Sequence, residues 1–498
     1  MNFSFRVDSS PIIGMGHLMR CLTLANGLKK RGFECYFICR DFEGNGAQRF
    51  IGNDFPLELL SIEGLELNEN WLGVPLEKDI TDTVDIVAQT PIDWLVIDHY
   101  EIDQQWEKEF RAKFPETKIM VIDDLVRAHD CDLLLDQTYG RTEDEYRPIV
   151  SESAQLCLGT EFALLREEFI ALRSQVQQKP DNNEPHIFVT LGGGDQGNPL
   201  RTIGKALREL AQKYSFSATV ITGDVPDEHL SDYKSIGDNI ELISFSNDIA
   251  AEMVKADFAI GAGGGTSWER CCLGLPTVVL TIADNQIEIS RILNEKEASL
   301  SVLTVKQEIA DAAEKLLSDP TLVAKMSENA ASLCDEKGVA RVVDNIVASS
   351  FEFRVANNSD AKFIYDARYD GDASKFYRNK EVPSFEAHCD WLDRAFDNED
   401  IILLCMSLCG EDVAHVRLDK KIATSGEIGI CLAEAWRGRG LGQVVLQAAS
   451  QYFSSFGFAE IYAELHEVNQ PSVNIFSRAG YQYLSTDSEG FMRYLWQA

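Results

Sequence analysis

Short apolar runs alternate with helical patterns through the first third of the chain. The runs are rich in β-branched and aromatic residues, which is typical of parallel strands buried on both faces. They fall at residues 3–7, 35–39, 94–98, 119–123 and 133–136, with helical periodicity at residues 18–31 and 104–114. This alternation predicts a doubly wound α/β domain over residues 1–173.

The same alternation resumes after a polar segment at residues 174–185, which contains two prolines and no apolar period. Such a composition predicts a linker. A second α/β domain is expected over residues 185–347, because apolar runs recur at residues 187–190, 218–222, 240–243, 258–261 and 277–281. A different pattern begins near residue 353 without linker composition, and we expect a third domain over residues 352–498.

Composition favours a large cytoplasmic enzyme. At 498 residues, 45% of them hydrophobic, the chain is long enough for several buried cores. The net charge of −34 argues against a nucleic-acid or anionic-membrane partner, because such partners need a basic surface. The 12 cysteines show no metal-ligand spacing, so we expect reduced thiols and no metal. Neither an export signal nor an apolar run of about 18 residues is seen, so no membrane span is expected.

A glycine-rich turn, Arg437-Gly-Arg-Gly-Leu-Gly442, separates an apolar stretch at residues 427–433 from a helical pattern at residues 443–453. A strand, a glycine turn and a helix N-terminus offer unpaired N–H groups and a positive dipole end to a diphosphate. The turn resembles the acetyl-CoA pyrophosphate loop, Arg-x-x-Gly-x-Gly, of the Gcn5-related N-acetyltransferase (GNAT) family. Taken alone, such a run also occurs as an ordinary strand-to-helix turn.

A second segment, Asn469-Gln-Pro-Ser-Val-Asn-Ile-Phe476 followed by Ala479-Gly-Tyr481, is similar to the other GNAT signature. Phe476 stands where the family often has a tyrosine that protonates the leaving thiolate, so another group must do this or coenzyme A leaves as the thiolate. Glu427, Glu464 and His466 are candidate proton acceptors, although each can also be an ordinary solvent-facing strand residue. The resemblance implies acetyl-CoA as co-substrate, bound by Ile430, Leu432, Arg437, Gly438, Arg439, Gly440, Gly442, Asn469, Ser472 and Phe476.

His17 stands at the start of a helical pattern, directly after Gly14, Gly16 and the first strand. The two glycines can admit a phosphate or sugar close to the backbone. The positive end of the helix dipole favours a neutral imidazole that accepts a proton. A histidine here is also commonly a cap or a surface residue. Asp98 and the pair Asp123-Asp124 end two later strands, where carboxylates orient a histidine, bind sugar hydroxyls or simply cap helices.

Two glycine turns interrupt strand-to-helix junctions of the second α/β pattern, at residues 191–197 and 261–269. Such turns suit a diphosphate, and Glu269 can accept hydrogen bonds from ribose hydroxyls. Asn285 and Gln286 follow another strand at the same expected edge of the sheet. Neither turn is a Walker A motif or a spaced Gly-x-Gly-x-x-Gly, which argues against an ATPase or a dehydrogenase.

One set of motifs resembles the UDP-2,4-diacetamido-2,4,6-trideoxy-β-L-altropyranose hydrolases of pseudaminic acid biosynthesis over residues 1–347. It comprises Arg6-Val-Asp-Ser-Ser, Ile13-Gly-Met-Gly-His-Leu-Met-Arg20, Leu158-Gly-Thr-Glu-Phe-Ala-Leu-Leu-Arg166, the turn at residues 192–194, Trp268-Glu269 and Ala283-Asp-Asn-Gln286. At Gly194 the chain departs from the family, in which a serine is expected. The resemblance implies a glycosyltransferase-B-like pair of domains, related to the lipid II-forming N-acetylglucosaminyltransferase, with the UDP-sugar in the cleft between them. It implies His17 as the catalytic histidine and a substrate site of Asp8, Gly14, Gly16, Arg20, Asp98, Arg166, Gly193, Gly264, Ser267, Glu269, Asn285 and Gln286.

The two resemblances together predict a bifunctional enzyme. The C-terminal domain acetylates the amine of a UDP-4-amino-4,6-dideoxy sugar, one step earlier in the same pathway, and the N-terminal pair hydrolyses the acetylated product to UDP and free sugar. Alternative hypotheses are a UDP-sugar glycosyltransferase and a nucleotide-sugar-binding protein with a degenerate acyltransferase. The expected partners are the UDP-sugar and acetyl-CoA, and the other enzymes of the pathway are further candidates.

Overall fold

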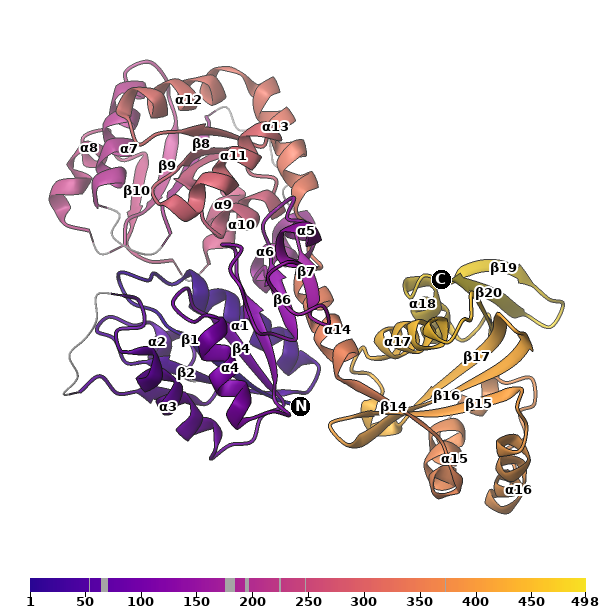
Figure 1. Cartoon of the computed structure of the whole chain (residues 1–498). Helices are drawn as coiled ribbons and strands as arrows, with labels where there is room; N and C mark the ends of the chain where they lie inside the picture. Colours follow the sequence, from indigo (N-terminus) through magenta and orange to yellow (C-terminus); the bar gives the residue numbers. More distant parts are fainter. Residues whose placement is uncertain are drawn as a thin grey trace. The chain divides into compact units, whose positions relative to one another are not determined.

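The computed structural model describes residues 1–498 except 53, 64–69, 175–183, 193–196, 224, 247 and 372. The described chain forms two compact units. The larger unit comprises Asn2–Lys29 and Phe33–Val343, and the smaller comprises Asp344–Ala498 together with Met1 and Lys30–Gly32. Figure 1 shows the elements of each unit in sequence colours.

The first sheet of the larger unit is entirely parallel, in the order β3-β2-β1-β4-β5-β6-β7. Every run predicted as a strand is present, while the edge strands β3 and β7 carry too few buried positions to be recognised. The strand order reverses between β1 and β4, the place where doubly wound sheets bind ligands. The strands are β1 (Asn2–Val7), β2 (Glu34–Arg40), β3 (Leu57–Leu60), β4 (Trp94–Asp98), β5 (Lys118–Ile122), β6 (Leu133–Asp136) and β7 (Gln155–Leu158). The helices are α1 (Gly16–Lys30), α2 (Ala47–Phe50), α3 (Leu76–Val87), α4 (Gln104–Lys113), α5 (Glu143–Tyr146), η1 (Thr160–Phe162) and α6 (Glu167–Leu172).

A second parallel sheet follows in the order β10-β9-β8-β11-β12-β13, which reverses between β8 and β11. Ala163, Leu165 and Phe169 pack into the core of this second sheet with Trp268, so the chain before the expected linker already contributes to it. The strands are β8 (His186–Thr190), β9 (Ser217–Ile221), β10 (Ile240–Ile243), β11 (Phe258–Ala262), β12 (Thr277–Leu280) and β13 (Ser299–Val302). The helices are α7 (Gly197–Leu210), η3 (Asp227–Leu230), α8 (Ser231–Lys234), α9 (Ile249–Lys255), α10 (Thr266–Cys272), η4 (Asp284–Gln286), α11 (Ile287–Glu295), α12 (Lys306–Ser318), α13 (Pro320–Leu333) and α14 (Gly338–Ser350).

The smaller unit contains a mixed sheet in the order β14-β15-β16-β17-β18-β20-β19, in which only β17 and β18 pair in parallel. Figure 1 shows α15 and α16 on one side of this sheet and α17 and α18 on the other. The strands are β14 (Phe351–Val355), β15 (Ile401–Leu408), β16 (Glu411–Ile422), β17 (Ser425–Leu432), β18 (Glu460–His466), β19 (Gln482–Thr486) and β20 (Phe491–Gln497). The helices are η5 (Asn358–Asp360), α15 (Ala361–Tyr369), η6 (Ala373–Phe376), α16 (Phe385–Phe396), η7 (Glu434–Trp436), α17 (Gly442–Ser455) and α18 (Gln470–Arg478).

The architecture agrees with the predicted fold class: two doubly wound parallel-sheet domains are followed by an α+β domain with a mixed sheet. The long apolar strands of the first two sheets are buried on both faces, because helices lie on each side. The predicted domain limits at residues 173, 185, 347 and 352 remain predictions, and most of the expected linker lies outside the described residues.

Candidate functional site

His17 lies at the carboxyl edge of the first sheet, in the first turn of α1. Its Nδ1 is 2.6 Å from Oδ1 of Asp98, the last residue of β4. An ionised carboxylate can only accept a hydrogen bond, so Nδ1 carries the proton and donates it to Asp98. The other ring nitrogen, Nε2, is then left with a lone pair. The structure therefore brings together a histidine and an aspartate with the geometry of a general base and its orienting group.

Arg20, one turn further along α1, holds Asp98 in place. Its guanidinium donates from Nε and from Nη2 to the two oxygens of Asp98, the latter bond being 2.7 Å long, and Nη1 lies 3.2 Å from Oδ2 of Asp124. Burial would raise the pKa of Asp98, but the charge of Arg20 and the contact with His17 outweigh it, and the pKa lies well below its usual range. Asp98 therefore stays ionised and fixed beside His17.

Two aromatic side chains that the sequence did not single out flank the His17 ring. Tyr100 makes an edge contact with it at 4.7 Å between ring centroids, Trp71 makes another at 5.6 Å, and the two aromatic rings stack on each other at 5.0 Å. The Tyr100 hydroxyl donates to Asp124 over 2.6 Å. Tyr100 directly follows Asp98-His99 at the strand end, a local signal that could have identified it. Trp71 has no such signal, because only the tertiary fold brings it to β4.

The remaining predicted residues of the first domain are placed differently. Asp8 is fully buried, and its Oδ1 accepts hydrogen bonds from Arg6 and from the backbone N–H of Arg40. Its place in the substrate site remains a prediction. Gly14 has a φ of 81°, a left-handed conformation that favours glycine. A Cβ added at Gly16 would meet no atom within 4 Å, so the backbone beside His17 is open to a ligand.

Glu269 of α10 and Arg166, two of the predicted substrate-site residues, contact each other. Arg166 donates from Nε to Oε1 of Glu269 over 3.0 Å, and its Nη2 lies 3.0 Å from the same oxygen. Among the described residues, the buried Oε2 atom has no hydrogen-bond partner. Burial raises the pKa of Glu269, and Arg166 opposes that rise. A buried acceptor without a donor fits a ligand hydroxyl, as expected for a ribose.

The other predicted groups of the second domain gather near the same strand ends. Gln286 accepts from the backbone of Ile282, and a Cβ added at Gly264 would lie 3.9 Å from its Nε2. Asn285 Nδ2 lies 3.4 Å from the hydroxyl of Tyr100. Ser267 is buried at the start of α10. Gly193 and Gly194 lie outside the described residues.

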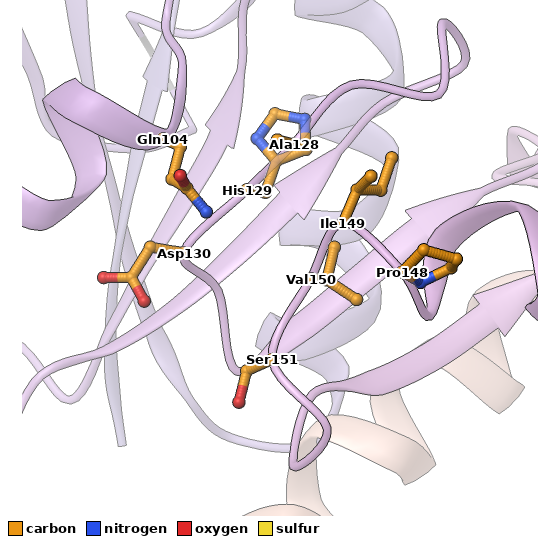
Figure 2. A pocket seen from close by; sticks show the side chains of 8 residues that line it. All are labelled: Gln104, Ala128, His129, Asp130, Pro148, Ile149, Val150 and Ser151. Atoms are coloured by element: carbon orange, nitrogen blue, oxygen red, sulfur yellow. The ribbon is translucent and has the colours of Figure 1, made fainter.

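An open cavity of about 490 Å³ lies elsewhere in the first domain and contains none of the predicted site residues. Figure 2 shows its lining, which includes His129 and Asp130. His129 is buried and its Nδ1 is 2.7 Å from Oε1 of Glu107, so the ring belongs to a structural pair. We assign no function to this cavity.

In the smaller unit, β17 and β18 separate after three paired residues. The pairing covers Ser425–Glu427 and Glu460–Tyr462, after which β17 runs on to Leu432 and β18 to His466. The end of β17 contains the predicted residues Ile430 and Leu432. It is not paired with β18, so this edge of the strand is left open. Such an edge can hydrogen-bond the amides of an extended ligand, which suits the pantetheine arm of acetyl-CoA.

The loop that follows β17 fits a diphosphate. Gly438 and Gly440 have φ values of 76° and 73°, which only glycine adopts easily. The following helix, α17, has no side-chain cap and no acidic residue in its first turn, so its terminal N–H groups are available to an anion. Arg439 lies over the Trp436 ring at 4.8 Å.

Arg437, expected to bind phosphate, is engaged by the protein itself. Its guanidinium donates to the carbonyls of Leu432 and Ala367 over 3.0 Å and to that of Asp370 over 3.3 Å. Arg437 therefore ties the loop to the end of α15. Gly442 has a packing role, because a Cβ there would lie 2.6 Å from Ile475 of α18.

The three candidate bases have different surroundings. Glu464 is held by Arg378, which donates to both of its oxygens over 2.6 and 2.8 Å. His466 accepts from a backbone N–H at Nδ1, so its neutral ring carries the proton on Nε2 and has no free lone pair. The Oε2 atom of Glu427 lies 3.1 Å from Nζ of Lys421, and Glu427 sits at the last paired position before the strands separate. Glu427 is the best placed of the three.

The second GNAT-like segment lies in α18. Asn469 caps this helix, since its side-chain oxygen accepts from the N–H of Ser472 over 3.3 Å. Phe476 is buried and packs edge-on against Tyr481 at 4.9 Å. The Tyr481 hydroxyl is 2.7 Å from the hydroxyl of Ser450. Phe476 is therefore a core residue without a proton to donate.

Comparisons with known proteins agree with this architecture. Residues 186–346 match the glycosyltransferase family 28 C-terminal domain, and residues 351–482 match the acetyltransferase (GNAT) domain. The chain is 27% identical over 259 residues to UDP-2,4-diacetamido-2,4,6-trideoxy-β-L-altropyranose hydrolase of Campylobacter jejuni, an alignment covering 52% of this chain and 83% of the relative. It is 24% identical over 500 residues to an uncharacterised protein of Methanocaldococcus jannaschii, with 97% of each chain covered.

A putative UDP-N-acetylglucosamine 2-epimerase from Listeria monocytogenes has the same fold as the larger unit. The superposition covers 70% of this chain and 96% of the epimerase chain, with a TM-score of 0.51 and 14% sequence identity. These comparisons confirm both resemblances predicted from the sequence: the chain is homologous to a UDP-sugar hydrolase and carries a GNAT domain.

No described group of three or more histidine, cysteine or acidic residues is arranged to hold a metal ion. Within the same residues, no helix is both long and apolar enough to cross a membrane.

Proposed function

We propose that this protein catalyses two consecutive steps of pseudaminic acid biosynthesis. Residues 352–498 transfer acetyl from acetyl-CoA to the amine at carbon four of a UDP-4-amino-4,6-dideoxy sugar. Residues 1–347 then hydrolyse UDP-2,4-diacetamido-2,4,6-trideoxy-β-L-altropyranose to UDP and the free sugar. The observation that carries the hydrolase is the His17–Asp98 pair at the switch point of the first sheet, in a chain homologous to a hydrolase of that name.

For hydrolysis, Nε2 of His17 takes a proton from water as its oxygen attacks the anomeric carbon. The bond between that carbon and the diphosphate oxygen breaks, and the electron pair leaves with UDP. Asp98 accepts from Nδ1 throughout, so it stabilises the imidazolium that forms. The Trp71–Tyr100 stack covers the His17 ring and offers a flat apolar surface beside the sugar.

The second domain supplies the nucleotide site in this proposal. The free Oε2 of Glu269 accepts from a ribose hydroxyl while Arg166 holds Oε1. The turn between β11 and α10, with Gly264 and Ser267, receives the diphosphate. Binding a leaving group whose negative charge grows during the reaction is commonly the largest catalytic contribution.

For acetyl transfer, the sugar amine attacks the thioester carbonyl carbon of acetyl-CoA. Glu427 accepts the proton that the amine loses, and the carbon–sulfur bond breaks. Phe476 has no proton to give, so coenzyme A departs as the thiolate or takes its proton from another group. The loop with Gly438 and Gly440 and the uncapped start of α17 hold the diphosphate of the cofactor.

Incubation of the protein with UDP-2,4-diacetamido-2,4,6-trideoxy-β-L-altropyranose and no other sugar tests the hydrolase. The proposal expects equal amounts of UDP and free sugar. UDP formed only after a sugar or lipid acceptor is added would identify a glycosyltransferase, and binding without turnover would identify a nucleotide-sugar-binding protein.

A further inference from the structure

Arg270 is a buried cation in α10 that lacks an acidic partner among the described residues. Only 1% of it is exposed. Its Nη2 donates to the carbonyl of Ala262 over 2.7 Å and to Oγ of Ser267 over 3.0 Å, and its Nη1 donates to Oγ1 of Thr266 over 3.1 Å. All three acceptors are neutral, and Nε has no partner within the described structure.

The two other fully buried arginines are paired differently. Arg6 and Arg40 each form ion pairs with Asp79, and Arg6 also pairs with Asp8. A buried charge without a counter-ion is costly, so it is normally neutralised, paired or used. Burial lowers the pKa of Arg270 to about 10, which still leaves the guanidinium charged at neutral pH. The positive charge is therefore present in the folded protein. No carboxylate of the described residues contacts it, and the neighbouring Glu269 acts on it only through its charge.

The guanidinium lies against the end of β11, just before the turn to α10. A Cβ added at Gly261 would be 2.8 Å from Nη1 of Arg270. In the turn itself, a Cβ at Gly263 would lie 2.4 Å from Oγ of Ser290, whereas one at Gly264 would meet nothing closer than 3.9 Å and one at Gly265 nothing within 4 Å. The turn is therefore packed against α11 at Gly263 and open at Gly264 and Gly265, where an anion can approach it.

We infer that Arg270 is a positioning residue for the diphosphate of the nucleotide sugar, acting through the turn from β11 to α10. This inference rests on the proposed function. Thr266 and Ser267 accept hydrogen bonds from Arg270, so their hydroxyl protons are free to be donated to phosphate oxygens. The charge beside the turn attracts the ligand and stabilises the leaving diphosphate as its bond to the anomeric carbon breaks. In the low-dielectric interior such an attraction is stronger than at the surface.

The test compares UDP with uridine, because the two ligands differ only in the diphosphate. Calorimetry on the Arg270→Met protein should show UDP affinity reduced by about 10-fold or more, with uridine affinity within twofold of the parent. The melting temperature of the ligand-free variant should equal or exceed that of the parent, because an uncompensated buried charge has been replaced by an apolar side chain of similar length. A merely structural arginine would instead lower it.

Arg173→Met is the matched control. Arg173 also donates to backbone carbonyls, those of Cys272, Cys334 and Ala331, but from the opposite end of α10. The Arg173→Met substitution should leave the ratio of UDP affinity to uridine affinity unchanged. Arg270→Gln keeps an amide donor without the charge, and it should show the same selective loss of UDP affinity. This variant replaces Arg270→Met in the test if the methionine variant does not fold.

Equal UDP affinity in parent and folded Arg270→Gln or Arg270→Met protein would overturn the inference, as would a parallel loss of uridine affinity. A parent protein that binds UDP no more tightly than uridine would instead count against the proposed nucleotide-sugar site itself.

Discussion

The imidazole of His17 and the carboxylate of Asp98 are joined by a 2.6 Å contact at the reversal point of the first sheet. Because Arg20 holds the same carboxylate, neither Asp98 nor the tautomer of His17 has freedom to change without breaking several bonds. This arrangement orients Nε2 of His17 as a proton acceptor, and the hydrolase proposal depends on it.

Replacing His17 by alanine should reduce UDP release by about two to four orders of magnitude, since the general base is lost. Asp98→Asn should lower the rate of UDP release by a large part of that factor, because an amide neither fixes the tautomer of His17 nor stabilises its imidazolium form. Acetyl transfer, measured as coenzyme A release, should stay at the parental rate in both variants. A folded His17→Ala protein that keeps more than about half of its hydrolytic rate would remove His17 from the mechanism.

Glu269→Gln should weaken substrate binding more than turnover. A ribose contact is similar in ground and transition states, so its loss raises KM by about 10-fold with little change in kcat. Steady-state kinetics of UDP release provide the measurement. An unchanged KM would make Glu269 a structural partner of Arg166 only.

Gly440→Val should abolish acetyl-CoA binding, because a side chain is forced onto a left-handed backbone at the loop. Gly457→Val is the control: its φ of 92° is also left-handed and a Cβ there meets no atom within 4 Å, but it lies at the far end of α17. Calorimetry should show lost binding in the first variant and parental binding in a folded second one. The reverse result would contradict the loop assignment. A Cβ would lie 2.5 Å from Nη1 of Arg31 at Gly440 and 2.6 Å from Ile475 at Gly442, so the fold of a valine variant at either position is checked by its melting temperature before binding is measured.

Glu427→Gln should slow acetyl transfer by about two orders of magnitude at neutral pH and recover partly at higher pH, where the free amine is more abundant. Glu464→Gln should have a smaller effect, because Arg378 already occupies both oxygens of Glu464. Coenzyme A release at several pH values distinguishes them. A larger loss in Glu464→Gln than in Glu427→Gln would reverse the assignment.

The buried pair of His129 and Glu107 predicts a pH dependence of stability. Burial would lower the pKa of His129, but the carboxylates of Asp123, 3.7 Å from Nε2, and Glu107, 2.7 Å from Nδ1, outweigh it and raise the pKa to about 9. The folded pKa exceeds the unfolded one of about 6.5, so the stabilisation is complete below about pH 6.5 and is lost as pH rises through about 9. Its size is on the order of 3 kcal/mol.

Denaturant unfolding between pH 6 and pH 10 should therefore show a falling free energy of unfolding. His129→Asn should flatten that part of the profile. An identical slope in parent and variant would place the titration elsewhere.

The local parts of this structure were predictable from the sequence. Buried parallel strands show as continuous apolar runs, and a left-handed turn such as Gly438 to Gly440 needs glycine at fixed spacing. His17 and Asp98 were also identifiable, because both stand at strand-to-helix junctions.

Roles that depend on tertiary contacts were not predictable in this way. Trp71 reaches His17 from a loop after β3, and Arg437 is taken up by carbonyls of α15. Asp8 follows a strand just as a site residue would, but the sequence does not show that Arg6 and the backbone N–H of Arg40 both bond to its Oδ1 atom. Arg270 carried no signal, since only the packed structure shows that a cation is buried there with no carboxylate of the described residues in contact with it.

The central claim is that acetylation precedes hydrolysis on one chain. A hydrolase pocket for two acetamido groups should reject the free amine, because a cationic ammonium loses the matched hydrogen bonds and must be desolvated. The deciding measurement is UDP release from the UDP-4-amino-4,6-dideoxy sugar with and without acetyl-CoA. We predict slow release that rises at least about 10-fold when acetyl-CoA is added, and no such rise in Gly440→Val. Fast release without acetyl-CoA, or an equal rise in Gly440→Val, would contradict the account.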